Sequence, residues 1–307
     1  MTTSDYPVQD EHASPGGVPA PRRRGKTAAP APDDVLSLPR PAVTVDVALL
    51  TVREGQLRTL LVRRDREPAS GEWSLPGGVV GLDEPLDDAA ARVLKERASV
   101  TGVFAEQLYT FGAPGRDPRT RVIGVAYYAL VDAEALDQAV NSHAAVARAI
   151  VKGTDAGIRV ARLVVPWDGE SGGPVGAEDD AGEALPLAFD HAEILGAAVK
   201  RIRGKLGYAT IGFELLPSRF SLAELRHVHE TITGRPMNKD SFRRRILDRG
   251  RVSATGQRAA GVGHRPPQLY RFSDPQALAA VAEVLGTAPG STPLPPGGPP
   301  ITLRQHL

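Results

Sequence analysis

Residues 73–100 read WSLPGGVVGLDEPLDDAAARVLKERASV, and this stretch decides the fold expected for the first half of the chain. Its landmarks are Gly78, Glu84 and Arg92, which are separated by five and by seven residues. Glycines and a proline mark a loop before residue 86. The spacing of the three landmarks is long and specific, so this loop and the helix after it form the first candidate functional motif.

Hydrophobic periodicity around this stretch predicts strands and helices. Apolar residues recur at helical spacing within residues 86–98. Apolar and β-branched runs predict strands at 43–51, 57–64, 107–112, 121–131 and 159–165, with a second helix at 133–152. Residues 168–184 contain six acidic and no basic residues, so we expect a solvated loop there. Strands with interspersed helices indicate an α/β or α+β domain.

Both ends of the chain are rich in glycine and proline. Residues 1–41 contain eleven of these residues, and residues 286–300 contain ten. Such composition buries too little apolar area to offset chain entropy, so we expect disordered tails. The absence of cysteine excludes disulfides, cysteine-ligated zinc and cysteine nucleophiles. No apolar run approaches the roughly 20 residues of a membrane span, and no signal peptide is recognisable, so we expect a cytoplasmic protein.

Charge is distributed unevenly along the chain, although the net charge of the 307 residues is only +1. Residues 196–272 contain sixteen Lys and Arg against five Asp and Glu, a net charge of +11. Residues 41–195 carry a net charge of −9. The asymmetry predicts two domains with different partners, of which the basic one binds a polyanion.

The basic region has the element order of a winged helix-turn-helix: helix, helix, basic helix and hairpin, at 188–206, 221–234, 238–249 and 251–272. Ser221 and Glu224 form a capping box, and Asn238 is the expected N-cap of the third helix. Gly234 and Gly250 mark the ends of the second and third helices. In such a domain the third helix enters the major groove of double-stranded DNA.

Residues 238–249 are therefore predicted to be a recognition helix. Phe242 and Ile246 are one turn apart and should face the core, which leaves the basic residues near the outer face. We expect sequence readout by residues near the start of the helix, Lys239, Ser241 and Arg243. We expect phosphate contacts from arginines of the helix and the wing, Arg244, Arg245, Arg258 and Arg265.

The spacing from Gly78 to Arg92, preceded by residues 73–78, resembles the signature of the Nudix superfamily, G-x5-E-x7-R-E-U-x-E-E-x-G-U, where U is a bulky aliphatic residue. The resemblance implies an α+β fold in which a Nudix-like α/β/α sandwich binds nucleoside diphosphates linked to another group. Active members hydrolyse the pyrophosphate with divalent metals, which the glutamates of R-E-U-x-E-E hold.

The chain departs from that signature where the chemistry takes place. Val93 and Arg97 stand where metal-binding glutamates are expected, and Ser99 replaces the glycine. Of the helix carboxylates only Glu96 remains, and one carboxylate beside a guanidinium would hold Mg²⁺ poorly. Arg97 could neutralise phosphate charge but could not activate water. We therefore expect no catalytic residue, no bound metal and no cofactor.

Six residues are candidates for ligand binding: Gly77, Gly78, Arg92, Glu96, Arg116 and Arg119. The last two lie on the loop 115–119, where two arginines suit a pyrophosphate. Two simpler interpretations stay open. Arg92 and Glu96, one turn apart, could form only a helix salt bridge, and the loop could be an ordinary solvated hairpin.

A Nudix-like domain followed by a winged helix resembles the Nudix-related transcriptional regulators of the NrtR family. The motifs that carry the likeness are residues 73–78, the altered Nudix helix, and residues 114–119, 187–191, 215–217 and 241–245. The resemblance implies a homodimeric bacterial repressor of NAD-related genes. Its Nudix domain would sense ADP-ribose or a related NAD metabolite without hydrolysing it. Effector binding would release an inverted-repeat operator.

These observations predict four regions: a tail at 1–41, a Nudix-like ligand-binding domain at 42–187, a winged helix-turn-helix domain at 188–285 and a tail at 286–307. Two alternatives remain. One is an active Nudix pyrophosphohydrolase that acts on nucleoside diphosphate derivatives. The other is a regulator that responds to a different effector, such as a sugar phosphate or a sugar nucleotide.

Overall fold

The computed structural model describes residues 38–103, 105–150, 157–206, 211–259 and 266–273, and from 143 to 150 only the backbone. Nearly all of the two expected tails, together with Arg265 of the expected wing, lies outside these residues. Every helix and strand named below belongs to one compact unit, residues 41–307. Among the described residues, no helix has the length and apolar character needed to cross a membrane.

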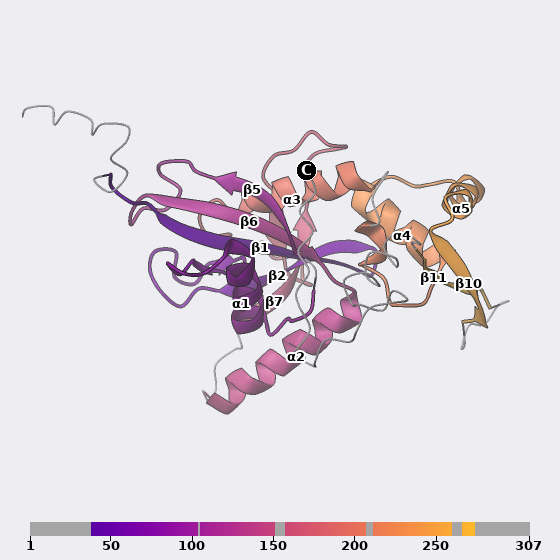
Figure 1. The fold of residues 1–307 in the computed structure, drawn as a ribbon, viewed down its shortest axis with the longest axis horizontal. Coiled ribbons are helices and arrows are strands. Elements are labelled where there is room, and N and C mark those ends of the chain that lie inside the picture. The colour runs from indigo at the N-terminus through magenta and orange to yellow at the C-terminus, as the bar shows by residue number, and fades with distance from the viewer. Residues whose placement is uncertain (1–37, 104, 151–156, 207–210, 260–265, 274–307) are drawn as a thin grey trace, which may run out of the picture. The chain divides into compact units, whose positions relative to one another are not determined.

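A mixed β-sheet forms the centre of the first domain (Figure 1). Its strands are β1 (Ala42–Arg53), β2 (Gln56–Arg63), β3 (Trp73–Ser74), β4 (Gly77–Val79), β5 (Ala105–Phe111), β6 (Val122–Leu130), β7 (Ile158–Val164) and β8 (Gly176–Glu178). The order is β5-β6-β1-β2-β7-β8, with β3 paired to β2 and β4 paired to β1. β1 and β6 are parallel, and the other pairs are antiparallel.

Helices cover both faces of this sheet, which explains why β1 is an almost continuous apolar run. α1 (Leu86–Ala98) and α2 (Ala133–Ile150) share a core with Val47 and Leu49 on one face. α3 (His191–Lys205) shares a core with Ala48 and Leu50 on the other face (Figure 1). The predicted α/β/α sandwich is confirmed, and α1 has the bounds that its periodicity predicted.

Two sequence-based expectations need correction in this domain. We assigned residues 188–206 to the C-terminal domain, but α3 packs on the sheet because its buried apolar stripe, which includes Ile194 and Val199, faces β1 and β2. We also expected a solvated loop at 168–184, but this segment contains β8 and buries Val175 and Ala177. Three of its six acidic residues form ion pairs with arginines of neighbouring strands, in the pairs Arg58–Asp180, Arg159–Asp179 and Arg162–Glu178.

The second domain is a winged helix. It consists of the 3-10 helix η2 (Ile211–Phe213), β9 (Phe220–Ser221), α4 (Leu222–Thr233), α5 (Lys239–Asp248), β10 (Val252–Arg258) and β11 (Gln268–Phe272). The strands form a small antiparallel sheet in the order β10-β11-β9. Phe220, Leu225, Phe242, Ile246 and Tyr270 make its core. Sequence periodicity missed β9, because a strand of two residues has no measurable alternation.

Candidate functional sites

The capping groups of the winged helix lie where the sequence placed them. The side chain of Ser221 accepts a hydrogen bond from the backbone N–H of Glu224, whose carboxylate accepts one from the N–H of Ser221. At the start of α5, Asn238 Oδ1 accepts hydrogen bonds from the N–H groups of Asp240 and Ser241, at 3.1 and 3.0 Å. The two caps fix where α4 and α5 begin, and the cap at Asn238 thereby helps to set which residues of α5 face outward.

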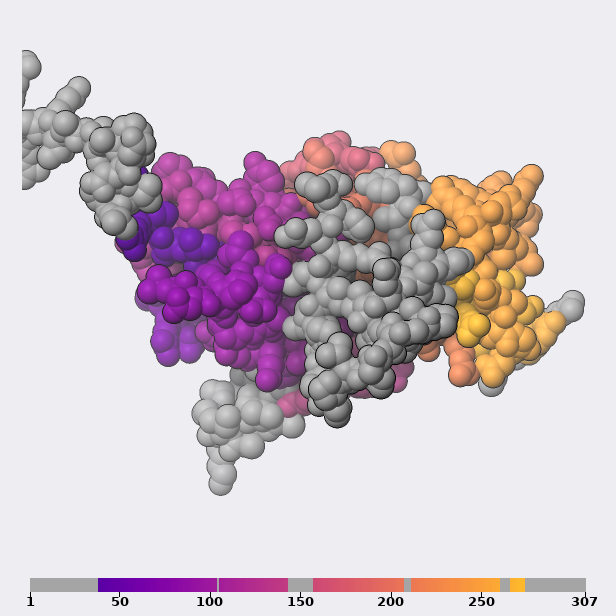
Figure 2. Space-filling model, viewed as in Figure 1, coloured from indigo at the N-terminus to yellow at the C-terminus, as the bar shows by residue number. Residues whose placement is uncertain are grey.

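α5 presents its basic side chains to solvent and its apolar ones to the core. Phe242 and Ile246 are 2% and 6% exposed, as predicted. The candidate DNA-binding residues of the helix are all exposed: Lys239, Ser241, Arg243, Arg244 and Arg245. In Figure 2 this part of the chain, in orange, lies at the surface. The arrangement leaves the cations of α5 available to a polyanion.

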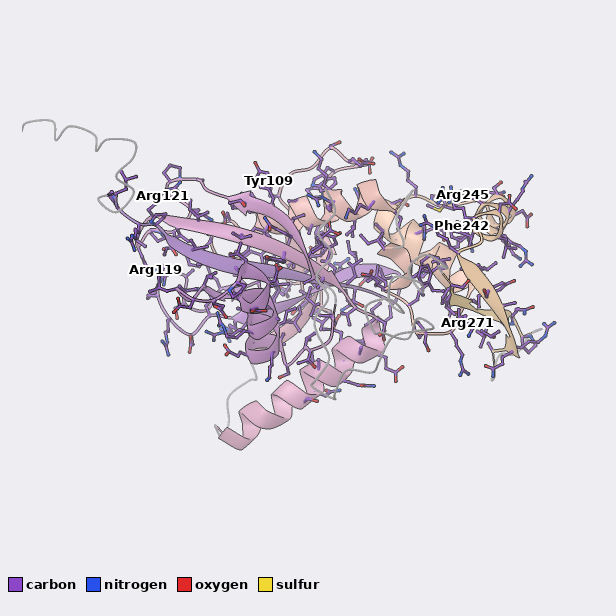
Figure 3. All side chains as sticks on the ribbon, in the orientation of Figure 1. Tyr109, Arg119, Arg121, Phe242, Arg245 and Arg271 are labelled. Carbon is purple, nitrogen blue, oxygen red and sulfur yellow. The ribbon has the colours of Figure 1, made fainter. Side chains whose placement is uncertain are left out.

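One face of α5 borders a surface hollow lined by Ser241, Arg244, Arg245, Asp248 and Arg249. The guanidinium of Arg245 also lies over the Phe242 ring at 5.4 Å, a position that holds the long side chain against the helix (Figure 3). Arg243 is not among the residues around this hollow. The arginines of α5 therefore do not all present one common surface.

The hairpin contributes further arginines. Arg258 is exposed and donates a hydrogen bond to the Pro266 carbonyl. Two exposed arginines that the sequence analysis did not select also belong to this domain, Arg219 before β9 and Arg271 on β11 (Figure 3). Arg219 donates a hydrogen bond to the side chain of Gln257 on β10. The only sequence signal for them was the charge excess of residues 196–272.

In the Nudix-like stretch, Arg92 holds the loop against the helix. Its guanidinium donates to both carboxylate oxygens of Glu84 at 2.6 and 2.9 Å, to the Val79 carbonyl at 3.0 Å and to Glu96 at 3.4 Å. The hydrogen bonds from Arg92 lower the pKa of Glu84 to about 2. Arg92 is therefore more than a helix salt bridge with Glu96, because its closest contacts cross the loop.

The two glycines of the loop make room for protein atoms. A Cβ at Gly77 would clash with the side chain of Asp46 on the paired strand β1. A Cβ at Gly78 would approach Val93 to 3.1 Å. Ser99 adopts the left-handed conformation, with φ of 55°, at the C-cap of α1. The Nudix signature has glycine at this position, and glycine adopts the left-handed conformation without steric cost. Serine adopts the same conformation less favourably.

Arg116 forms a buried ion-pair network. Its side chain is 5% exposed, and its Nε and Nη2 donate to the two carboxylate oxygens of Asp190, both at 2.7 Å. Its Nη2 also lies 3.6 Å from the Asp46 carboxylate. Asp190 immediately precedes α3. We expected Arg116 to contact a ligand directly, but here its donors are engaged by carboxylates inside the protein.

His191 ties the same end of α3 to the Nudix loop. Its Nδ1 accepts a hydrogen bond of 2.9 Å from the backbone N–H of Leu75, and its Nε2 lies 3.7 Å from Asp46. Burial lowers the pKa of His191, so the ring is neutral with its proton on Nε2. The first residues of α3 are thus bonded both to the loop at residue 75 and to the loop of Arg116.

A cavity of about 280 Å³ opens beside these two loops. Five arginines line it, Arg63, Arg64, Arg66, Arg97 and Arg119, together with Gly77 and two acidic residues, Asp65 and Glu67. We refer to it as the arginine pocket. Of the six predicted ligand-binding residues, Gly77 and Arg119 line it, whereas Gly78, Arg92, Glu96 and Arg116 do not.

The arginine pocket contains residues that the sequence analysis did not select. Arg63 is the last residue of β2, and Arg64 and Arg66 follow it; the run RRDR before the loop was the signal available for them. Arg64 lies over the Phe189 ring at 4.6 Å. Arg97 comes from the last turn of α1. Arg119, labelled in Figure 3, comes from the loop between β5 and β6. Three separate segments thus bring positive charge to one cavity.

Another cavity, of about 480 Å³, lies between the β1–β2 turn and α4. Its lining includes four carboxylates, those of Glu54, Asp132, Glu134 and Glu224. An anionic ligand would be repelled there, so the arginine pocket is the better candidate for a phosphate group.

The residues at the expected metal positions do not fit a divalent cation. Val93 is 1% exposed and packs in the core beneath α1. Glu84 and Glu96 both accept hydrogen bonds from Arg92. Among the described residues, no group of three or more His, Asp or Glu side chains is arranged to hold a metal ion.

An α/β/α sandwich with a Nudix-like loop and helix, followed by a winged helix with an exposed basic helix, defines a Nudix-type DNA-binding regulator. The NUDIX domain model matches residues 40–158, and the model of the NrtR DNA-binding winged helix domain matches residues 212–272. The ADPR responsive transcriptional repressor NtrR of Acinetobacter baylyi is 33% identical over 239 residues, which are 76% of this chain and 83% of that protein. The chain belongs to the NrtR family.

Solved structures agree with this assignment. Shewanella oneidensis NrtR in complex with a 27mer DNA is 31% identical with a TM-score of 0.59, and the match covers 75% of this chain and 93% of that one. A MutT/nudix family protein from Enterococcus faecalis is 25% identical with a TM-score of 0.57, over 77% of this chain and 88% of that one. Both likenesses extend well beyond the sandwich alone.

Proposed function

We propose that this protein is a transcriptional repressor of NAD-related genes that releases its operator when ADP-ribose or a related NAD metabolite binds the arginine pocket. The observation that carries the proposal is the pocket itself, a cavity lined by five arginines on a Nudix scaffold. The Acinetobacter relative is an ADP-ribose responsive repressor, which supports both the sign of regulation and the effector class. A pyrophosphate offers the oxygens that guanidinium groups bind best.

The Nudix domain in this proposal binds its effector without hydrolysing it and needs no cofactor. The support is chemical: Val93 and Arg97 offer no carboxylate, and Glu84 and Glu96 are engaged by Arg92. Metal-assisted hydrolysis needs a cation that activates water, which a guanidinium cannot do.

The protein acts on DNA as a homodimer in the cytoplasm. Two copies of α5, related by a two-fold axis, would read successive major-groove faces about 34 Å apart, which requires an inverted-repeat operator. Exposed Lys239, Ser241 and Arg243 would contact bases, and Arg244, Arg245, Arg258 and Arg265 would contact phosphates.

Helix α3 connects the arginine pocket, where the effector would bind, with the helices of the DNA-binding domain. Its first residues bind both loops beside the arginine pocket, through His191–Leu75 and Asp190–Arg116. Near its end, the guanidinium of Arg203 donates a 2.7 Å hydrogen bond to the Ile232 carbonyl of α4. Ile202 of α3 also shares a core with Ile232. A ligand that shifts the pocket loops would therefore shift α3, and through it the DNA-binding helices.

The test begins by selecting DNA from a random-sequence library with the full chain. We expect the selected sites to contain an inverted repeat. Fluorescence anisotropy with such a site should then show that ADP-ribose weakens DNA binding by about 5- to 150-fold, the range of ordinary coupling free energies. DNA binding that ADP-ribose and related dinucleotides leave unchanged would contradict the proposed response.

Hydrolysis is measured separately, with ADP-ribose and Mg²⁺ or Mn²⁺. We expect no turnover by the unmodified protein. Turnover at about 1 per second or faster would be ordinary enzymatic activity and would favour a working pyrophosphohydrolase instead.

A further inference from the structure

Arg97 differs from the other arginines of the pocket, because each of those has a hydrogen bond or an ion pair within the described residues. It extends from the last turn of α1 and is exposed. Of the other four pocket arginines, Arg119 is 2.7 Å from Asp117 and Arg66 is 3.9 Å from Asp65. Arg63 and Arg64 donate to the carbonyls of Gly71 and Pro68. Within the described part of the chain, no hydrogen bond or ion pair is found for the guanidinium of Arg97.

The charge of the pocket favours an anion over a metal ion. Its lining carries five arginines against Asp65 and Glu67, which leaves a net charge of +3. A divalent cation entering this field would be repelled, and the described residues supply no cluster of oxygen ligands to hold it. A pyrophosphate group carries the opposite charge and brings its own oxygens.

We infer that Arg97 does the electrostatic work of the divalent cation expected in a Nudix site, so that a pyrophosphate-containing ligand binds this pocket free of metal. The inference rests on the proposed function and adds the chemistry of recognition. Val93 removes one oxygen ligand by burying an apolar side chain, and Arg97 replaces another by a positive charge. A guanidinium can donate two parallel hydrogen bonds to phosphate oxygens without any bound ion.

Arg97 therefore takes the place of a metal ion, and added metal should not strengthen binding. Mg²⁺ in solution would neutralise part of the ligand charge that the arginines recognise. Affinity should accordingly be as high with EDTA as with Mg²⁺, or higher, and it should fall as salt increases.

The experiment is calorimetric titration of the full chain with ADP-ribose, in EDTA and again in Mg²⁺, for four proteins. These are the unmodified protein, Arg97→Gln, Arg97→Lys and Lys95→Gln. Lys95 is the matched control, because it is an exposed cation on the same turn of α1 that does not line the pocket. Thermal denaturation of each variant verifies its fold.

We expect the unmodified protein to bind ADP-ribose in EDTA. Arg97→Gln should weaken binding by about 10- to 100-fold, which is the range for losing a hydrogen-bond partner of a charged group. Arg97→Lys should retain part of the affinity, because it keeps the charge but loses the planar fork. Lys95→Gln should bind like the unmodified protein.

The outcomes separate this inference from the proposed function. ADP-ribose binding that requires Mg²⁺, or that Arg97→Gln leaves unchanged, would overturn the role of Arg97 while leaving the effector assignment intact. An equal loss of ADP-ribose affinity in Lys95→Gln would show that the overall positive charge, rather than the position of Arg97, determines binding. It would therefore also overturn the role of Arg97. An unmodified protein that binds no ADP-ribose in either buffer would overturn the proposed function itself.

Discussion

Arginines of the Nudix loops and arginines of α5 come from sequence motifs of similar prominence, yet the structure uses them in opposite ways. Arg92 and Arg116 are bound to carboxylates of the same domain, and Arg116 is only 5% exposed. Arg243 and Arg244 on α5 are exposed. A motif arginine whose charge is satisfied inside the protein holds the fold together, and one left in solvent is free to meet a ligand.

The loop between β5 and β6 carries both kinds of arginine. Arg116 and Arg119 are three residues apart on one loop, but Arg116 points into the protein whereas Arg119 is 58% exposed and lines the pocket. The direction of the side chain, rather than the residue type, separates a structural arginine from a ligand-binding one.

The largest expected effect is on stability. Arg116→Met should lower the free energy of unfolding by about 3–5 kcal/mol, because it removes the cation that the half-buried Asp190 and the buried Asp46 share. Arg119→Met should lower it by less than about 1 kcal/mol, because its pair with Asp117 is exposed on the arginine side. Urea denaturation of the two variants provides the measurement. Equal losses of stability would show that the loop does not distinguish the two residues as the structure does.

The next effect is on DNA affinity, with stability unchanged. Arg243→Ala should cost about 1–3 kcal/mol with the selected site and relax its specificity at one base pair. Arg244→Ala should weaken selected and random DNA alike and reduce the salt slope by about one. Anisotropy titrations at several salt concentrations measure both, with Lys95→Ala as an exposed control outside α5. If neither α5 variant differs from the control, α5 is not the recognition helix.

The third effect concerns His229, which is buried in the winged helix with its ring 5.1 Å from that of Phe242. Burial, together with the charges of Arg245 and Arg249, lowers the pKa of His229 from 6.5 to about 4. As the pH falls, the unfolded chain therefore binds this proton at a higher pH than the folded protein does. The free energy of unfolding is accordingly at its full value above about pH 6.5 and decreases as the pH drops towards 4.

At pH 5 the lowered pKa of His229 reduces the free energy of unfolding by about 2 kcal/mol. His229→Gln should remove that part of the acid sensitivity, which urea denaturation at pH 7.5 and pH 5 can measure. His227→Gln is the control, because His227 is exposed on the same helix. A pH profile that His229→Gln does not flatten would show that this ring is already charged in the folded protein.

Local signals in the sequence were enough for most of the helices. The periodicity of residues 86–98 predicted α1 within its bounds, and the caps at Ser221 and Asn238 predicted the starts of α4 and α5. Such features depend on neighbours within one or two turns, so they can be recognised without knowing the rest of the fold. The same locality explains why the charge of α5 was assigned to an outer face correctly.

The site residues were harder to predict, because their roles depend on partners distant in sequence. Arg116 pairs with Asp190 across 74 positions, and His191 binds the Leu75 amide across 116. No local pattern shows whether such a partner exists. Arg63 and Arg64 appeared as ordinary charges at a strand end until the fold placed them beside Arg97 and Arg119.

The sequence by itself determined the order of the longer helices and strands, the altered metal positions at Val93 and Arg97 and the basic third helix, because each of these depends on residue type and spacing. Only the tertiary structure decided which arginines are free. A guanidinium is available to a ligand when no buried carboxylate claims it, and that depends on chain segments that meet only in the folded protein. For the same reason, the packing of α3 on the sheet could be established only from the complete core.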